Sequence, residues 1–289
     1  MHISEILKAQ KIDPVEEFNR IEFLLNENSI PYGLYDLISL KLWINKNTFR
    51  NLNIRDRYTD IDDMLKNIGI YNSISQFNYD TECLEDPNKC FEKLYLYCEV
   101  LLNIISESSR DLFNCADANK VANHISKNIS KILEKTHCKI SKVEDGIIIV
   151  DNNYVATEAV ECIDNDVSLA CAIMEYNRIL NKGNVERKKQ ILLQLATYTE
   201  PWYNDFKETA YDKLYDDYRF LANEIDIRHN NKQSSKNIFT DGWTPKDYEN
   251  WYDKTYHTIL MVIIARRQLM ITEEIQELKI KKIPNPNLK

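Results

Sequence analysis

The sequence predicts a mainly α-helical protein, a multi-helix bundle with one small antiparallel β-hairpin. Apolar residues recur at three- and four-residue steps over most of the chain, which is the period of an amphipathic helix. Near residues 138–150 that period gives way to an alternating, strand-like pattern. Glycine is scarce, with 5 in 289 residues, where average usage would give about 20. Folds that need many tight turns or Gly-rich phosphate loops, such as Rossmann and P-loop enzymes, are therefore disfavoured.

The first helix is predicted to begin at Pro14, because Pro suits the first turn and Asp13 can cap it. Its apolar face comprises Val15, Phe18, Ile21 and Leu25. A second helix is expected from Pro31 to about Trp43. A third, short helix is expected behind residues 59–62, where a Thr with an acid three positions later resembles a capping box, and it should end at Gly69.

The clearest helical pattern in the chain covers residues 91–105, and we expect it to be a core helix. Another helix is expected through residues 121–133. Between 138 and 150 apolar and polar residues alternate, and Asp145-Gly146 supplies a turn, so this stretch predicts the β-hairpin.

Four further helices are predicted in the C-terminal half. They cover about residues 166–182, with Gly183 after the last turn, then 184–200, 211–225, and a long helix that begins at Thr244-Pro245 and runs past Arg267. The resulting organisation has three parts: an N-terminal helical region (1–115), a helix plus hairpin (116–164) and a C-terminal helical bundle (165–289).

The formal net charge is −8, which repels a polyanion at long range, so no binding to duplex DNA is expected. Seven scattered cysteines without C-x-x-C spacing indicate reduced thiols rather than a zinc site. No metal and no cofactor are expected. The N-terminus lacks the features of a secretory signal and no apolar run reaches 18 residues, so we expect a cytoplasmic protein without a membrane segment.

Two acidic features allow two interpretations each. Asp60, Asp62 and Asp63 could gather a hard cation, or they could form a capped helix N-terminus. Glu175 lies beside apolar neighbours in a predicted helix. It either faces inward, where burial would raise its pKa, or belongs to an outward polar strip.

Cations gather at one helix junction, where Arg187 and Lys188 could meet the phosphates of a nucleic acid. A solvated charged face is the alternative. Trp and Tyr residues between 198 and 256 could stack on bases, or they could pack in a core.

The most specific candidate site is Arg228-His229-Asn230-Asn231. Arg228 could bind a phosphate and His229 could transfer a proton, while Asn230 and Asn231 could contribute to nucleic-acid binding. A base near a ribose 2′-hydroxyl and a cation on the phosphate are what metal-independent RNA cleavage needs. His257 could approach if the two helices pair antiparallel. The alternative is a helix C-terminus whose Arg and His interact with the dipole.

An Arg followed at once by a polar residue at a helix end, in an antiparallel helical pair, resembles the HEPN-type helical domains of bacterial abortive-infection and toxin proteins. The resemblance covers about the last 125 residues. It implies a metal-independent RNase whose site forms between two protomers, and a role in phage defence. The chain departs from the family motif in one respect: where a second His is expected it has Gln233, Ser234 and Ser235.

Two hypotheses about function follow. The first is an abortive-infection-like protein, either a metal-independent endoribonuclease acting on RNA through Arg228, His229 and His257 or a catalytically degenerate relative. The second is a non-catalytic helical module that senses or binds a protein partner. Both allow a homodimer. Convergence of Arg228, His229 and His257 in one solvent-reachable cleft would favour the enzyme, whereas Arg228 and His229 splayed apart as helix caps would favour the interaction module.

Overall fold

The computed structural model describes residues 12–47, 60–67, 87–144, 146–163, 166–228 and 239–280. Helices dominate these ranges, which confirms the mainly α-helical fold. The chain divides into two compact units, Met1–Asn152 and Asn153–Lys289, called unit 1 and unit 2 below. The expected middle part, residues 116–164, is thereby shared between them. None of the described helices combines the length and apolarity that a membrane span requires.

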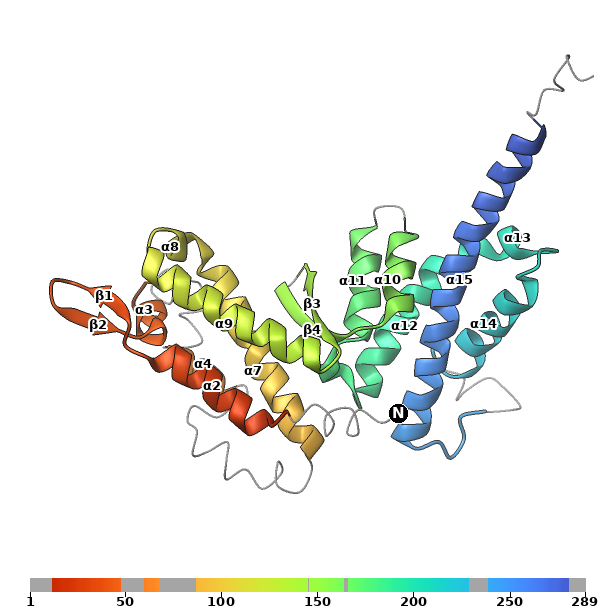
Figure 1. Cartoon of the computed structure of the whole chain (residues 1–289). Helices are drawn as coiled ribbons and strands as arrows, with labels where there is room; N and C mark the ends of the chain where they lie inside the picture. The colour runs from red at the N-terminus through yellow and green to blue at the C-terminus, as the bar shows by residue number, and fades with distance from the viewer. Residues whose placement is uncertain are drawn as a thin grey trace, which may run out of the picture. The chain divides into compact units, whose positions relative to one another are not determined.

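Unit 1 is built around three helices, α2 (Pro14–Asn26), α7 (Pro87–Glu107) and α9 (Ala116–Lys135), which pack against one another (Figure 1). Helix α2 starts as predicted, because the Asp13 side chain accepts hydrogen bonds from the backbone N–H groups of residues 15 and 16. The predicted apolar faces of all three helices are buried except at Val15, Ile105 and Val121, which are partly buried. A short helix, α8 (Ser109–Phe113), connects α7 to α9.

The predicted β-hairpin is present as β3 (Cys138–Val143) and β4 (Gly146–Asp151), which pair antiparallel. Asp145 of the predicted turn lies outside the described residues. Strand β4 is held by α7: the Asn103 amide donates to the carbonyl of Ile147 and accepts from its N–H, both at 2.7 Å. Four residues earlier, Glu99 accepts from the N–H of Ile149 at 2.9 Å. Side chains of a helix thus satisfy backbone groups of the strand.

The helix predicted from Pro31 to Trp43 is wrong in its first half. Residues Ile30–Tyr32 (β1) and Asp36–Ile38 (β2) form a second, short antiparallel hairpin, and helix α3 covers Leu40–Asn47. Gly33 turns the chain with φ +73°, a conformation that glycine adopts without steric cost. Of the apolar residues that suggested a helical face, Leu34 and Leu37 are exposed on this hairpin, whereas Ile38 is buried.

Helix α4 (Ile61–Asn67) confirms a short helix behind the acidic cluster, while Thr59 and Gly69 lie outside the described residues. Asp60 accepts from the N–H of Asp63 at 2.9 Å, and Asp62 forms an ion pair with Lys41. These contacts correspond to the helix-cap interpretation. Within the described ranges, no group of three or more His, Cys, Asp or Glu side chains is placed to hold a metal ion.

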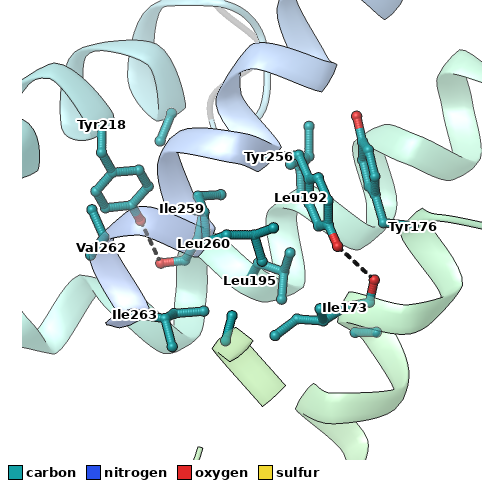
Figure 2. Close-up of a cluster of buried hydrophobic side chains, with 14 of the residues drawn as sticks. Ile173, Tyr176, Leu192, Leu195, Tyr218, Tyr256, Ile259, Leu260, Val262 and Ile263 are labelled. Atoms are coloured by element: carbon teal, nitrogen blue, oxygen red, sulfur yellow. Dashed lines mark hydrogen bonds between the residues drawn. The ribbon is translucent and has the colours of Figure 1, made fainter. Parts of the chain in front are cut away.

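Unit 2 is a bundle in which the long helix α15 (Pro245–Ile280) contacts α10 (Tyr154–Glu161), α12 (Val185–Thr199) and α14 (Asp212–Glu224), while α11 (Val167–Tyr176) packs on α10 and α12 (Figure 1). Figure 2 shows the core between them. Its buried side chains come from every one of these helices and include Ile173, Leu192, Leu195, Tyr218, Ile259 and Leu260.

Two boundaries in unit 2 differ from prediction. Helix α10 was not expected, because its buried side chains include the small residues Ala156 and Ala159, which give a weak periodic signal. The helix expected over 166–182 ends at Tyr176, where Asn177 takes the cap, and a short 3-10 turn, η2 (Ile179–Asn181), follows. Many of the aromatic residues between 198 and 256 pack in the core, as in the second of the two interpretations above.

Candidate functional site

Arg228 closes the turn that follows α14. Its N–H donates to the carbonyl of Ala222 at 3.0 Å, and Asp226 just before it adopts a left-handed conformation with φ +65°. The guanidinium forms an ion pair with Glu200 of the 3-10 turn η3 (Glu200–Trp202), and the Arg228 side chain is only 15 % exposed. The RNase hypothesis requires the Arg228 guanidinium to bind a phosphate of the RNA. In the structure this guanidinium already binds the carboxylate of Glu200.

Two tyrosines of α14, Tyr215 and Tyr218, also contact the end of α12 beside Arg228. The hydroxyl of Tyr215 donates to the carbonyls of Thr199 and Glu200, at 2.9 and 3.0 Å. Burial raises the pKa of Tyr215 to about 12, and nearby Tyr218 adds to this, whereas the positive charge of Arg228 acts in the opposite direction. The hydroxyl of Tyr218 is within 2.6 Å of the Thr199 hydroxyl. Arg228 thus takes part in a packed contact between helix ends.

Of the other predicted catalytic residues, the structure describes His257 alone. His229, Asn230 and Asn231 lie outside the described residues. His257 is exposed on α15, and no hydrogen bond or ion pair among the described residues joins it to Arg228. The catalytic roles of Arg228, His229 and His257, and the nucleic-acid contacts of Asn230 and Asn231, stay predictions.

Arg187 and Lys188, the predicted nucleic-acid cations, both contact carboxylates within unit 2. Arg187 reaches Glu175 with Nη2 at 2.6 Å and Nε at 2.7 Å. Glu175 is therefore neither unpaired in the core nor part of a simple polar strip, because it bridges α11 to the first turn of α12. Lys188, the next residue, contacts carboxylates of α15 instead and is 5 % exposed.

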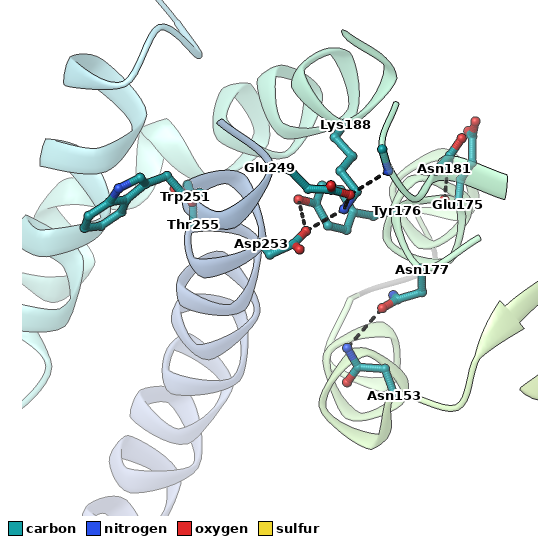
Figure 3. A network of polar contacts seen from close by, with 11 residues as sticks. Asn153, Glu175, Tyr176, Asn177, Asn181, Lys188, Glu249, Trp251, Asp253 and Thr255 are labelled. Atoms are coloured by element: carbon teal, nitrogen blue, oxygen red, sulfur yellow. Dashed lines mark hydrogen bonds and ion pairs between the residues drawn. The ribbon is translucent and has the colours of Figure 1, made fainter. Parts of the chain in front are cut away.

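Lys188 is the buried centre of an ionic network that joins three elements (Figure 3). Its ammonium group lies 2.8 Å from a carboxylate oxygen of Glu249 and 2.8 Å from one of Asp253, both on α15. The hydroxyl of Tyr176, at the end of α11, donates to Asp253 at 2.9 Å, and the N–H of Gly183 donates to Glu249 at 2.6 Å. One lysine thus faces two carboxylates.

The titration of this network follows from its contacts. Burial acts to raise the pKa of Glu249, but the hydrogen bonds from Lys188 and the Gly183 N–H and the lysine charges outweigh it, so this pKa is lowered. Burial, with the charge of Asp253 next in size, raises the pKa of Tyr176 far above its ordinary range. The carboxylate is charged and the phenol neutral at neutral pH, which is the state in which both hold Lys188.

An amide layer continues the network towards α10. Asn177 donates to the carbonyl of Ile173 at 3.0 Å, and Asn153, the cap of α10, donates to the Asn177 carbonyl oxygen at 3.0 Å (Figure 3). Tyr256 stacks on Tyr176 with ring centres 3.9 Å apart. Its hydroxyl donates to the carbonyl of Ile173 at 2.7 Å (Figure 2). The whole arrangement fixes α11 and α12 against α15. The lysine at its centre is paired with two carboxylates.

Sequence reasoning identified Lys188 as a cation but missed its partners, which lie 61 and 65 residues further along the chain. A signal was present: Glu249 and Asp253 are four residues apart, so they lie on one face of the same helix. Two acids on a face that also carries the buried Tyr252 and Tyr256 indicate a cation in the opposing helix.

Comparison of the chain with protein-family models, with curated proteins and with solved structures finds no match.

Proposed function

We propose that this protein is a non-catalytic helical interaction module that binds a protein partner. The observation that carries the proposal is the β1–β2 hairpin of unit 1, whose side chains Tyr32, Leu34, Tyr35 and Leu37 are all exposed. Leu34 and Tyr35, in the turn, are 89 % and 95 % exposed. Four exposed apolar side chains within one short hairpin are typical of a protein-binding surface. The partner is one that offers an apolar groove to this turn.

The engagement of the cations supports the same proposal. Arg228, Arg187 and Lys188 each contact a carboxylate within unit 2. An anionic ligand would have to displace a carboxylate at each of them, and it would approach a protein of net charge −8. RNA cleavage and a role in phage defence, implied by the resemblance to HEPN-type domains, form the competing proposal.

The location and assembly of the module are part of the proposal. The seven cysteines of the chain are scattered and have no C-x-x-C spacing, which favours a reducing compartment such as the cytoplasm. The proposal expects a protein partner, and a homodimer is compatible with it.

One experiment separates the two proposals. Purified wild-type protein is incubated with labelled single-stranded RNA, and an Arg228→Ala variant is treated in parallel. We expect no cleavage by either protein and a melting temperature only slightly lowered in the variant, because a partly exposed ion pair contributes about 1 kcal/mol. Cleavage by the wild type that disappears in a folded Arg228→Ala variant would overturn the proposal in favour of the RNase.

A second experiment tests the hairpin directly. A photoactivatable amino acid replaces Tyr35, and another replaces the exposed Lys213 of α14 as the matched control. A protein crosslinked only from position 35 is then purified, and its binding to wild-type and Leu34→Asp chains is compared. We expect at least a tenfold weaker complex with Leu34→Asp, because a charge would enter the apolar groove. Equal affinity for both chains would contradict the role of the hairpin.

A further inference from the structure

Helix α15 changes character along its length. From Tyr252 to Ala265 it contributes eight buried residues to the core of unit 2. Further along, Arg266 forms an ion pair with Asp205 at 3.0 Å and a cation–π contact with Trp202 at 4.3 Å, and Leu269 still packs against the core. The final turns of the helix extend beyond the other helices of unit 2 (Figure 1).

These final turns carry an apolar stripe. Ile271, Ile275 and Leu278 follow one another at steps of four and three residues, so they share one face of the helix. Their exposure increases along the helix: Ile271 is half-buried, Ile275 is 43 % exposed and Leu278 is 71 % exposed. This four-three spacing is the seam pattern of a coiled coil, with Ile275 at position a and the other two at position d.

We propose that the stripe binds the same stripe of a second copy of this chain, and that the two helices run parallel. The proposal rests on the proposed function and names the partner of this helix. Charges beside the seam determine the direction. Glu274 and Lys279 are exposed at positions g and e, and in a parallel, in-register pair Glu274 of each copy faces Lys279 of the other.

An antiparallel pair centred on the same stripe is disfavoured. It would place Ile271 of one copy beside Leu278 of the other, and Glu274 would then face Glu274 of the second copy, with like charges in contact. The charge pattern is therefore complementary to a second copy in the parallel orientation only.

The contact should be weak and reversible. Each copy contributes three seam residues, far fewer than an obligate dimer interface. The helix is, however, already formed by its packing in unit 2, so association does not have to nucleate it. We expect a dissociation constant of about 10–100 µM, because a small interface gains little beyond the entropy lost on association.

Sedimentation velocity of the full-length chain over about 1–300 µM measures this association. Wild type should pass from monomer to dimer, and Leu278→Asp should weaken the dimer at least tenfold. Ile280→Asp is the matched control, because Ile280 is 83 % exposed two residues away but lies off the seam. A wild type that stays monomeric, or a control that weakens the dimer as much as Leu278→Asp, would overturn the proposal.

Charge exchange tests the parallel orientation. Glu274→Lys and Lys279→Glu should each weaken self-association, because each creates like-charge contacts with the second copy. The double variant should recover wild-type association, since both cross-helix pairs are restored with inverted signs. Failure of the double variant to recover would contradict the parallel pairing.

Crosslinking gives a second measure of orientation. In a parallel pair the two copies of residue 278 lie opposite each other, so Leu278→Cys should form an intermolecular disulfide under mild oxidation that wild type and Ile280→Cys do not form. No excess of crosslinked dimer over wild type would refute the parallel pair. The hairpin variant Leu34→Asp should leave self-association unchanged, so a failure of this inference is distinguishable from a failure of the proposed function.

Discussion

Each unit buries side chains with ionisable groups, but the two units satisfy them differently. In unit 1 the carboxylate of Glu22 accepts hydrogen bonds from neutral donors, the hydroxyl of Tyr97 and the amide of Asn26. In unit 2 the ammonium group of Lys188 lies between two carboxylates. In unit 1 the neutral donors only complete the hydrogen bonds of the Glu22 carboxyl group. In unit 2 the ion pairs complete the hydrogen bonds of Lys188 and also balance its charge. Loss of one partner should therefore be more damaging in unit 2 than in unit 1.

The largest effect is expected for Lys188→Met. Methionine matches the length of the aliphatic stem, but it leaves Glu249 and Asp253 facing each other without the cation. Removing one partner of a buried ion pair costs about 3 kcal/mol at the lower end of the usual range, and this end applies because Asp253 is partly solvated. Chemical denaturation, followed by a signal from unit 2, measures the change in the free energy of unfolding. The control Lys213→Met, at an exposed position of α14, should alter stability by less than about 0.5 kcal/mol.

A smaller but still clear effect is expected for Gly146→Ala in unit 1. Gly146 has φ +131°, and an added Cβ would overlap Oδ1 of Asn103, so the amide that holds β4 would have to move. Strain and the loss of hydrogen bonds together should cost about 2 kcal/mol. Gly183→Ala is the matched comparison, because φ is +77° there but nothing lies within 4 Å of an added Cβ. Equal losses in the two variants would show that the Asn103 contact does not matter.

The stability of unit 2 should depend on pH through the ionisation of Glu249. Its pKa is lowered in the folded protein, against burial, by Lys188 and the Gly183 N–H, so the unfolded chain binds the proton more tightly. The stabilisation is therefore present above about pH 4.5 and is lost as the pH falls through the lowered pKa. Urea midpoints of wild type and Glu249→Gln should differ at pH 7 and converge towards pH 3. A difference that stays constant with pH would contradict this, and the exposed Glu273→Gln should show none.

The smallest effect is expected for Glu22→Gln. The Gln amide oxygen can still accept from Tyr97, whereas its NH2 group replaces the oxygen that accepts from Asn26, so only one of the two hydrogen bonds is lost. Stability should change by less than about 1 kcal/mol in either direction. A loss as large as that of Lys188→Met would remove the distinction between the two units.

The periodic elements of this fold could be predicted from sequence, because burial of one helix face leaves a local pattern. The helix through residues 91–105 and the hairpin near 138–150 are examples. The segment 31–38 was misread because Leu34 and Leu37 have helical spacing, yet both are exposed on a hairpin. Exposure cannot be read from spacing alone.

The candidate site was less predictable, since its contacts are distant in sequence. Arg228, Arg187 and Lys188 were identified by their charge, but their carboxylate partners come from other helices. A local sequence motif shows which chemical groups are present, but it does not show which of them come into contact in the folded chain. The same limit applies to His257, which sequence allowed to approach Arg228 and which the structure shows exposed on α15.

The position of α15 as the last helix of unit 2 has a consequence for how that unit folds. Its contacts with α11 and α12 close loops of 61 to 83 residues. Contacts between the neighbouring helices α10, α11 and α12 close much shorter loops of the chain, so these contacts can form first. Docking of α15 is then the late, slow event of folding, and destabilising changes at its buried face should act mainly on the rate at which unit 2 opens.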